Sequence, residues 1–399
     1  MQLNYFLEFL KQVLYTFRPL SYGEKAGISE ALNHITKKDA SRLKTLVKRK
    51  SLKIEMKNMP YSALITDILK YPSCTALDDN RKMAADGFNS KIKESLDEKI
   101  QEEFKTNAFN KTISLIAPKI VGFDNIKKAA ALQLFSSDSF HMLLLGDPGT
   151  GKTDILRAAE NLAPISSFGL GSGTSGTGLT TTVLGNEVKK GILSLADGGL
   201  AVIDELNLMK KEDRAGLYNA MEKGFITYDK GGHHYKFPAN CSLLASANPK
   251  KDTVIGHDMF GIKKQLPFEP ALLSRFHLVF LVRKQDIEQF MEIADEVLTG
   301  KHKDVSKADA EFMKKYVEHA RKINVRFPEK FNDDIKAFVL NARSKEKQML
   351  FDVTPRFVIG LKRLIEASAR CELRDCVCKK DVKRVIEMYV QALKGVGFN

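Results

Sequence analysis

The stretch Gly146-Asp-Pro-Gly-Thr-Gly-Lys-Thr153 directly follows the apolar run His141-Met-Leu-Leu-Leu145. It fits the pattern G-x-x-x-x-G-K-[ST] in the strand–loop–helix context that the pattern requires. Such glycines let backbone N–H groups point inward and form an anion-binding nest at a helix N-terminus. This context disfavours a chance glycine turn. We therefore predict an ATP site made by Gly146, Asp147, Pro148, Gly149, Thr150, Gly151, Lys152 and Thr153, with Lys152 on the outer phosphates and Thr153 on Mg2+.

The residues around this loop predict an α/β fold. Short apolar runs, separated by glycine-rich turns and helical patterns, occur at Met142–Leu145, Leu200–Ile203, Leu243–Ala247 and Leu278–Val282. This alternation is typical of a parallel sheet wrapped by helices. The sequence before and after has helical periodicity only. We predict a helical N-terminal region (1–112), a P-loop core (113–290) and a linker with an α-helical lid (291–399). The glycine-rich stretch Gly169–Gly178 predicts a flexible loop.

One further apolar run is followed by side chains suited to nucleotide hydrolysis. The run Leu200–Ile203 is followed by Asp204 and Glu205, at the strand end where ligands of open α/β sheets bind. Asp204 would hold Mg2+ through water, and Glu205 would polarise the attacking water as general base. An apolar strand ending in Asp-Glu is often structural, but some fifty residues after a P-loop the functional interpretation is favoured.

Two polar residues complete the candidate site, each with an ordinary alternative. Asn248 follows the run Leu243–Ala247 and could orient the lytic water, although Asn before Pro is also a common turn. Arg275 precedes the run Leu278–Val282. An arginine at this point can serve a neighbouring subunit as an arginine finger, which stabilises charge on the transferred phosphoryl group.

Composition favours a polyanionic partner inside a cell. The 63 Lys+Arg against 49 Asp+Glu give a net charge of +14 and a pI near 9.3. Basic residues concentrate in Lys37–Lys57, where a solvated face is as good an interpretation as a phosphate-binding one. Five cysteines, an odd number, argue against a disulfide framework and for a reducing compartment, and we assign them no metal cluster. We therefore predict a cytoplasmic protein. No apolar run is long enough to span a membrane.

Taken together, the motifs resemble the minichromosome maintenance (MCM) family of AAA+ replicative helicases, particularly the archaeal members. The resemblance covers about seven-tenths of the chain, with a shortened N-terminal region. It is carried by Ile116–Phe135, Leu195–Arg214, Tyr218–Gly232, Leu272–Phe280 and Val353–Arg370. Asn207 and Leu208 depart from the family pattern by replacing an acidic and a basic residue. His277 likewise replaces an acidic residue.

The resemblance implies an ATP- and Mg2+-dependent DNA helicase that works as a hexameric ring around a single strand. By this resemblance, the Ile120–Val121 backbone lies near adenine and Arg356 acts in trans as sensor 2. Lys230 corresponds to the lysine that faces the central pore from the hairpin before sensor 1. Without the resemblance, Lys230 would be interpreted as a solvated hairpin lysine.

Two other functions stay open at this point. One is a protein-remodelling ATPase of the helix-2-insert group, similar to the MoxR and magnesium-chelatase motors. The other is a DNA-binding relic of the family without unwinding activity. An inactive relic is disfavoured because the ATPase residues are intact: Lys152, Asp204, Glu205, Asn248, Arg275 and Arg356. Stimulation of ATP hydrolysis by DNA would separate a translocase from a remodeller.

Overall fold

The computed structural model describes residues 107–395, with gaps at 185–186, 231–232, 257–258, within 285–303 and within 347–351. The chain divides into two units, residues 1–104 and 105–399, and every described residue belongs to the second. Helix α7 (Ala108–Leu115) packs against α8 (Asp124–Leu134), and the predicted boundary at residues 112–113 falls within α7. The basic block Lys37–Lys57 lies outside the described residues.

A five-stranded parallel sheet forms the centre of the described unit, in the order β2-β5-β8-β1-β9. Its strands are β1 (His141–Gly146), β2 (Ser166–Leu170), β5 (Leu200–Asp204), β8 (Ser242–Ala247) and β9 (Leu278–Val282). Every residue of β1, β5 and β8 is buried. Because successive side chains point to opposite faces, both faces of the sheet are covered. The predicted parallel sheet wrapped by helices is confirmed.

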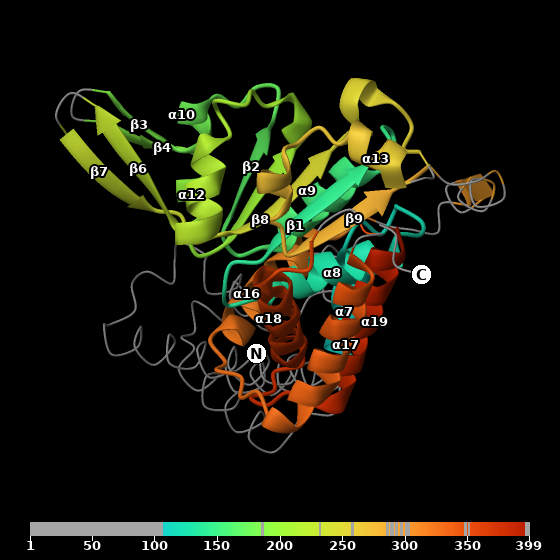
Figure 1. Cartoon of the computed structure of the whole chain (residues 1–399). Coiled ribbons are helices and arrows are strands. Elements are labelled where there is room, and N and C mark those ends of the chain that lie inside the picture. Colours follow the sequence, from blue (N-terminus) through green and yellow to red (C-terminus); the bar gives the residue numbers. More distant parts are fainter. Residues whose placement is uncertain are drawn as a thin grey trace, which may run out of the picture. The chain divides into compact units, whose positions relative to one another are not determined.

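The helical lid is also confirmed. Its long helices are α16 (Lys307–Arg321), α17 (Asn332–Ser344), α18 (Pro355–Cys371) and α19 (Lys379–Gly395). Helices α18 and α19 pack against each other and against α8, and α19 also contacts β9. In Figure 1 these orange and red helices lie below the sheet. The lid therefore rests on the end of the sheet where β9 begins.

Two β-hairpins lie outside the central sheet. One is β3 (Thr181–Leu184) with β4 (Glu187–Lys190), and the other is β6 (Phe225–Lys230) with β7 (His233–Pro238). Figure 1 shows the hairpins side by side, and β3 contacts β6. Segments distant in the sequence thus meet in one projecting region. Lys230 ends β6, where its backbone pairs with His233.

The predicted flexible loop at Gly169–Gly178 is wrong in part. Strand β2 extends through Leu170, and helix α10 (Gly176–Leu179) begins before the stretch ends. Close packing explains Gly169 and Gly171 better than flexibility does. A Cβ on Gly169 would lie 2.1 Å from the Ile192 side chain, and a Cβ on Gly171 would lie 2.1 Å from the Glu205 carbonyl oxygen.

The remaining α-helices of the described residues are short, except for α9, which follows the P-loop. They are α9 (Lys152–Leu162), α11 (Ile192–Leu195), α12 (Ala215–Lys223), α13 (Met259–Gln265) and α14 (Pro270–Leu273). Helix α9 packs against β2, β5 and β8 and so fixes the P-loop to the sheet. In the part of the chain that the structure describes, no helix combines the length and apolar character needed to cross a membrane.

Candidate ATPase site

The P-loop connects the inner strand β1 to helix α9, and its three glycines are required by its backbone geometry. A Cβ on Gly146 would lie 2.1 Å from the Val282 carbonyl oxygen, so only glycine fits between β1 and β9. Gly149 and Gly151 have φ angles of +74° and +79°, in the left-handed region that disfavours other residues. The loop thus has the conformation in which backbone N–H groups can surround an anion.

The Lys152 ammonium lies against this loop. Its Nζ donates hydrogen bonds to the carbonyl oxygens of Gly146 at 2.9 Å and Asp147 at 2.6 Å. Burial lowers the pKa of Lys152 to about 8, and the carboxylates of Asp147, Asp204 and Glu205 oppose that shift. A buried cation bonded only to neutral groups of its own loop is well placed to attract phosphate oxygens.

Asp147 has a structural role that the motif alone does not reveal. The side chain is 1% exposed, and its two oxygens accept hydrogen bonds from the Ile255 N–H at 2.7 Å and the Lys284 N–H at 2.9 Å. This carboxylate therefore holds the P-loop to two neighbouring segments. We assign it a bracing role and retain the other seven loop residues as proposed nucleotide ligands.

Thr153 and Asp204 come together although they are far apart in the sequence. The Thr153 hydroxyl donates to Asp204 Oδ2 at 2.7 Å, across the gap between α9 and the end of β5. This hydroxyl–carboxylate pair fits Mg2+, which favours oxygen ligands and binds few protein carboxylates directly. The predicted metal ligands are therefore adjacent.

Glu205 and Asn248 follow neighbouring strands. Glu205 has a φ of +52°, and its N–H donates to Ser246 Oγ at 2.9 Å. The Asn248 amide donates to Asp252 Oδ1 at 3.2 Å, and its backbone N–H donates to Asn207 Oδ1 at 2.9 Å. Strand β8 lies between β5 and β1, so Asn248 follows a strand that separates the P-loop strand from the carboxylate strand.

The segment predicted to lie near adenine contacts the P-loop. The Ile120 side chain packs over Gly151, where an added Cβ would lie 3.1 Å from Ile120 Cδ1. The Ile120 carbonyl accepts a hydrogen bond from Lys127. Ile120 and Val121 are thus beside the predicted phosphate-binding turn, which is consistent with a base-binding segment.

Arg275 and Arg356 lie together but at the opposite end of the sheet. Leu278 pairs with Met142 and Val282 pairs with Gly146, so the residues before β9 lie near the start of β1. The five-residue strand between the two ends spans about 16 Å. Arg356 donates to the Ser274 carbonyl at 3.1 Å, and burial followed by the Arg275 charge lowers its pKa.

Arg275 has partners of its own on this surface. Its Nη2 lies 2.9 Å from Glu222 Oε2, and its guanidinium lies 4.6 Å from the Tyr218 ring centroid. These contacts direct Arg275 toward helix α12. Within one copy of the chain, Arg275 and Arg356 lie at the end of the sheet opposite the P-loop. This arrangement is expected of residues that act on the site of a neighbouring copy.

Comparison with protein families identifies the chain. The model of the MCM P-loop domain matches residues 96–301, and the model of the MCM AAA-lid domain matches residues 311–393. The chain belongs to the minichromosome maintenance family. The fold, the motif order and the lid thus confirm the resemblance seen in the sequence.

The family's curated relatives include archaeal and eukaryotic proteins. The minichromosome maintenance protein MCM of Saccharolobus solfataricus is 33% identical over 72% of this chain and 45% of its own length. The DNA replication licensing factor mcm7-B of Xenopus laevis is 31% identical over 75% of this chain and 45% of its own. The chain therefore spans about half the length of the relatives it matches.

Three departures from the MCM pattern have identifiable environments. Asn207 accepts the Asn248 backbone N–H, whereas Leu208 is about half exposed. His277 is buried, and its Nδ1 accepts the His141 N–H at 2.9 Å. Arg363 of the lid lies 3.3 Å from His277 Nε2. His277 thus lies at the junction of sheet and lid.

Sequence reasoning missed Ser246 and the bracing role of Asp147. A serine within the buried strand Ser242–Ala247 is a weak signal by itself, because its partners come from β5. For Asp147, the motif position suggested a ligand, and only the fold shows which backbone groups surround the carboxylate. The Lys230 side chain lies outside what the structure describes, and its proposed contact with DNA rests on its place at the end of β6.

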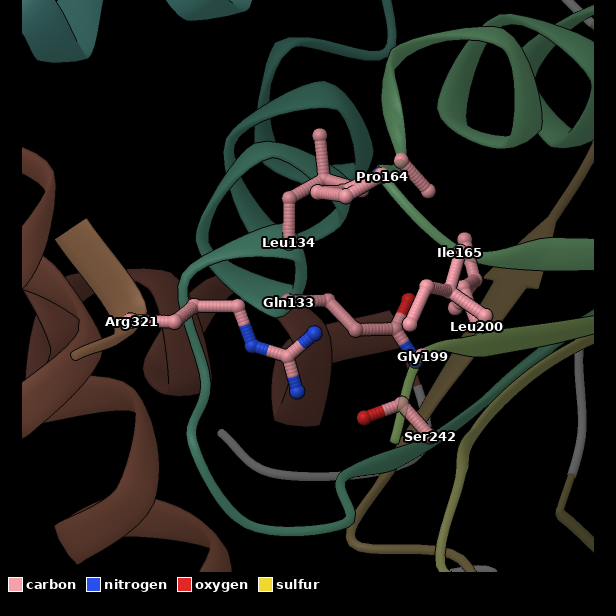
Figure 2. Close-up of a pocket in the computed structure, with 9 residues that line it drawn as sticks. Gln133, Leu134, Pro164, Ile165, Gly199, Leu200, Ser242 and Arg321 are labelled. Atoms are coloured by element: carbon pink, nitrogen blue, oxygen red, sulfur yellow. The ribbon is translucent and has the colours of Figure 1, made fainter. Parts of the chain in front are cut away.

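A small pocket lies at the amino end of strands β5 and β8. None of the proposed ATPase residues lines it. It is lined by Gln133, Leu134, Ala163, Pro164, Ile165, Gly199, Leu200, Ser242 and Arg321. Figure 2 shows the Arg321 guanidinium pointing into it. The Gln133 amide nitrogen donates to the carbonyl oxygens of Phe140 and Leu243, and these bonds hold the loop before β1 to β8. We interpret this pocket as structural.

Proposed function

We propose that this MCM chain is an ATP-driven DNA translocase or helicase that works as a ring of identical subunits, six in the simplest case. The observation that carries the proposal is the separation of two half-sites. The P-loop, Asp204, Glu205 and Asn248 lie at the carboxyl end of the sheet, whereas Arg275 and Arg356 lie near its amino end. A complete site then forms only between two copies.

The catalytic roles follow from the chemistry of each group. Bound Mg2+ and ATP would supply a polarised γ-phosphoryl group, with Thr153 and Asp204 on the metal side. Glu205 would take the proton of the attacking water, and Asn248 would orient that water. The partner's Arg275 would stabilise charge that develops on the phosphoryl oxygens, with Arg356 assisting from the lid.

The DNA part of the proposal rests on the adjacent hairpins and the charge of the chain. In a ring, Lys230 would face a central strand from each subunit and contact phosphates without reading bases. The Xenopus laevis relative is a DNA replication licensing factor, and the net charge of +14 suits a polyanion. The proposed location is the cytoplasm, or the nucleoid in a prokaryote.

A direct assay compares ATP hydrolysis and forked-duplex unwinding with and without single-stranded DNA. We expect Mg2+-dependent hydrolysis that DNA stimulates, together with strand separation. Hydrolysis that is insensitive to DNA would contradict the translocase and favour a protein remodeller. DNA binding without ATP hydrolysis would instead indicate that the chain is a DNA-binding relic of the family without unwinding activity.

A further inference from the structure

Ser246 connects strand β8 to the Asp204 carboxylate and to the backbone of Glu205. This residue of β8 is 1% exposed, and its hydroxyl donates to Asp204 Oδ1 while it accepts the Glu205 N–H at 2.9 Å. A serine hydroxyl has one proton to donate. Donation to Asp204 therefore fixes the hydroxyl in the orientation that leaves a lone pair for Glu205.

These two bonds control different features of the site. Asp204 Oδ2 accepts from Thr153, whereas Oδ1 accepts from Ser246 and, at 3.1 Å, from the Glu205 N–H. Ser246 therefore helps decide which oxygen faces the P-loop. Glu205 has a left-handed backbone with a φ of +52°, a conformation that is unfavourable for a non-glycine residue. The bond from its N–H to Ser246 helps to hold that backbone in place.

A second side-chain hydrogen bond connects the turn after β5 to the end of β8. Asn207, just after the carboxylates, accepts the backbone N–H of Asn248 at 2.9 Å. The turn after β5 and the end of β8 are therefore connected by side chains from both strands. A shift of one would move the proposed base and the proposed water-orienting amide together.

We infer that Ser246 is a positioning residue of the ATPase site, which sets the orientation of Asp204 and the backbone of Glu205. The inference rests on the proposed function, because it deepens the account of the same site. Ser246 acts through the Asp204 carboxylate and the Glu205 backbone and is given no contact with nucleotide. Misplacement by about 1 Å can cost about 100-fold in rate, so a group of this kind affects turnover more than binding.

The test compares Ser246→Ala and Ser246→Cys with Ser242→Ala in the full-length protein. Cysteine keeps the shape but is a weak donor. Ser242 belongs to the same strand, and its hydroxyl accepts the Phe140 N–H at 3.0 Å, away from the carboxylates. We expect both Ser246 variants to lose about 10-fold or more in kcat, with KM for ATP changed less than about twofold. They should also need more Mg2+ for half-maximal rate.

Two results would overturn the inference. One is wild-type kcat and Mg2+ dependence in Ser246→Ala, and the other is an equal loss of kcat in Ser242→Ala. If the wild-type protein hydrolyses no ATP, the proposed function fails, but binding of a fluorescent ATP analogue still tests Ser246. In that case Mg2+ must strengthen binding less in Ser246→Ala than in wild type, and an equal gain would overturn the inference.

Discussion

At the scale of single residues, Asp204 and Glu205 are sequence neighbours with different surroundings. Asp204 is buried and bonded to Thr153 and Ser246, whereas Glu205 follows the strand in a left-handed conformation. The Asp204 carboxylate thus accepts a hydrogen bond from the Thr153 hydroxyl, and Glu205 is the first residue of the turn that leads away from β5. This division supports the roles that we propose, with Asp204 as a metal ligand and Glu205 as the general base.

Glu205→Gln should retain ATP and Mg2+ binding but lose hydrolysis, because the amide has nearly the same shape and cannot accept a proton as a base. Glu212→Gln is the matched control, since Glu212 is exposed on the following turn. Fluorescent-nucleotide affinity and steady-state phosphate release measure the two effects. Wild-type turnover in Glu205→Gln would show that another group is the base.

At the scale of elements, the sequence predicted strands β1, β5, β8 and β9 because each is an apolar run. Strand β2 was missed because Ser166–Leu170 is polar and glycine-containing, and its glycine is required by a contact with Ile192. The site was predictable where motifs carry fixed spacing. Asp147 and Ser246 were not, because their partners come from distant segments.

The buried histidines give the junction of β1, β9 and α18 a pH dependence. Burial lowers the pKa of His277 to about 2 and that of His141 to about 3, helped in His277 by His141, Arg363 and Arg356. Both rings stay neutral in the folded protein but take up a proton near pH 6.5 when unfolded. Their stabilising contribution is complete above pH 6.5 and is lost progressively as the pH falls toward 3 and 2.

We therefore expect the free energy of unfolding to fall between pH 7 and pH 5, by up to about 2 kcal/mol for each histidine. Denaturant unfolding of wild type and His277→Gln measures the free energy of unfolding at each pH. This free energy should depend less steeply on pH in the variant. His319→Gln is the control, because His319 is exposed on α16. Parallel pH curves for wild type and His277→Gln would contradict this account.

The β6–β7 hairpin is the element that we propose contacts DNA. Lys230→Ala should weaken single-stranded DNA binding equally for all sequences. It should also lower the salt slope by about 0.7 for each phosphate that the lysine neutralises. Basal ATP hydrolysis should stay intact while unwinding is reduced.

The matched control is Lys236→Ala on the same hairpin, because Lys236 Nζ lies 3.8 Å from the Phe225 ring centroid. A charge reversal in the Lys48–Lys50 block tests a separate N-terminal contribution. Equal DNA affinity, salt slope and unwinding in wild type and Lys230→Ala would remove the pore assignment.

At the scale of the whole molecule, the central claim is that one ATPase site needs two copies of the chain. Within each copy, the sheet separates the P-loop from Arg275 and Arg356. The P-loop of a monomer would therefore lack these two arginines. Arginine fingers are worth about 10³- to 10⁵-fold in rate. Hydrolysis should therefore depend steeply on protein concentration until assembly is complete.

Mixing Arg275→Ala protein with Lys152→Ala protein tests this claim most directly. Each variant alone should be inactive, because every interface lacks either the finger or the P-loop lysine. In mixed assemblies some interfaces pair an intact P-loop with an intact Arg275, so ATP hydrolysis should return and peak at intermediate ratios. With mixed oligomers confirmed by light scattering and affinity-tag capture, no recovery at any ratio would contradict a site shared between subunits.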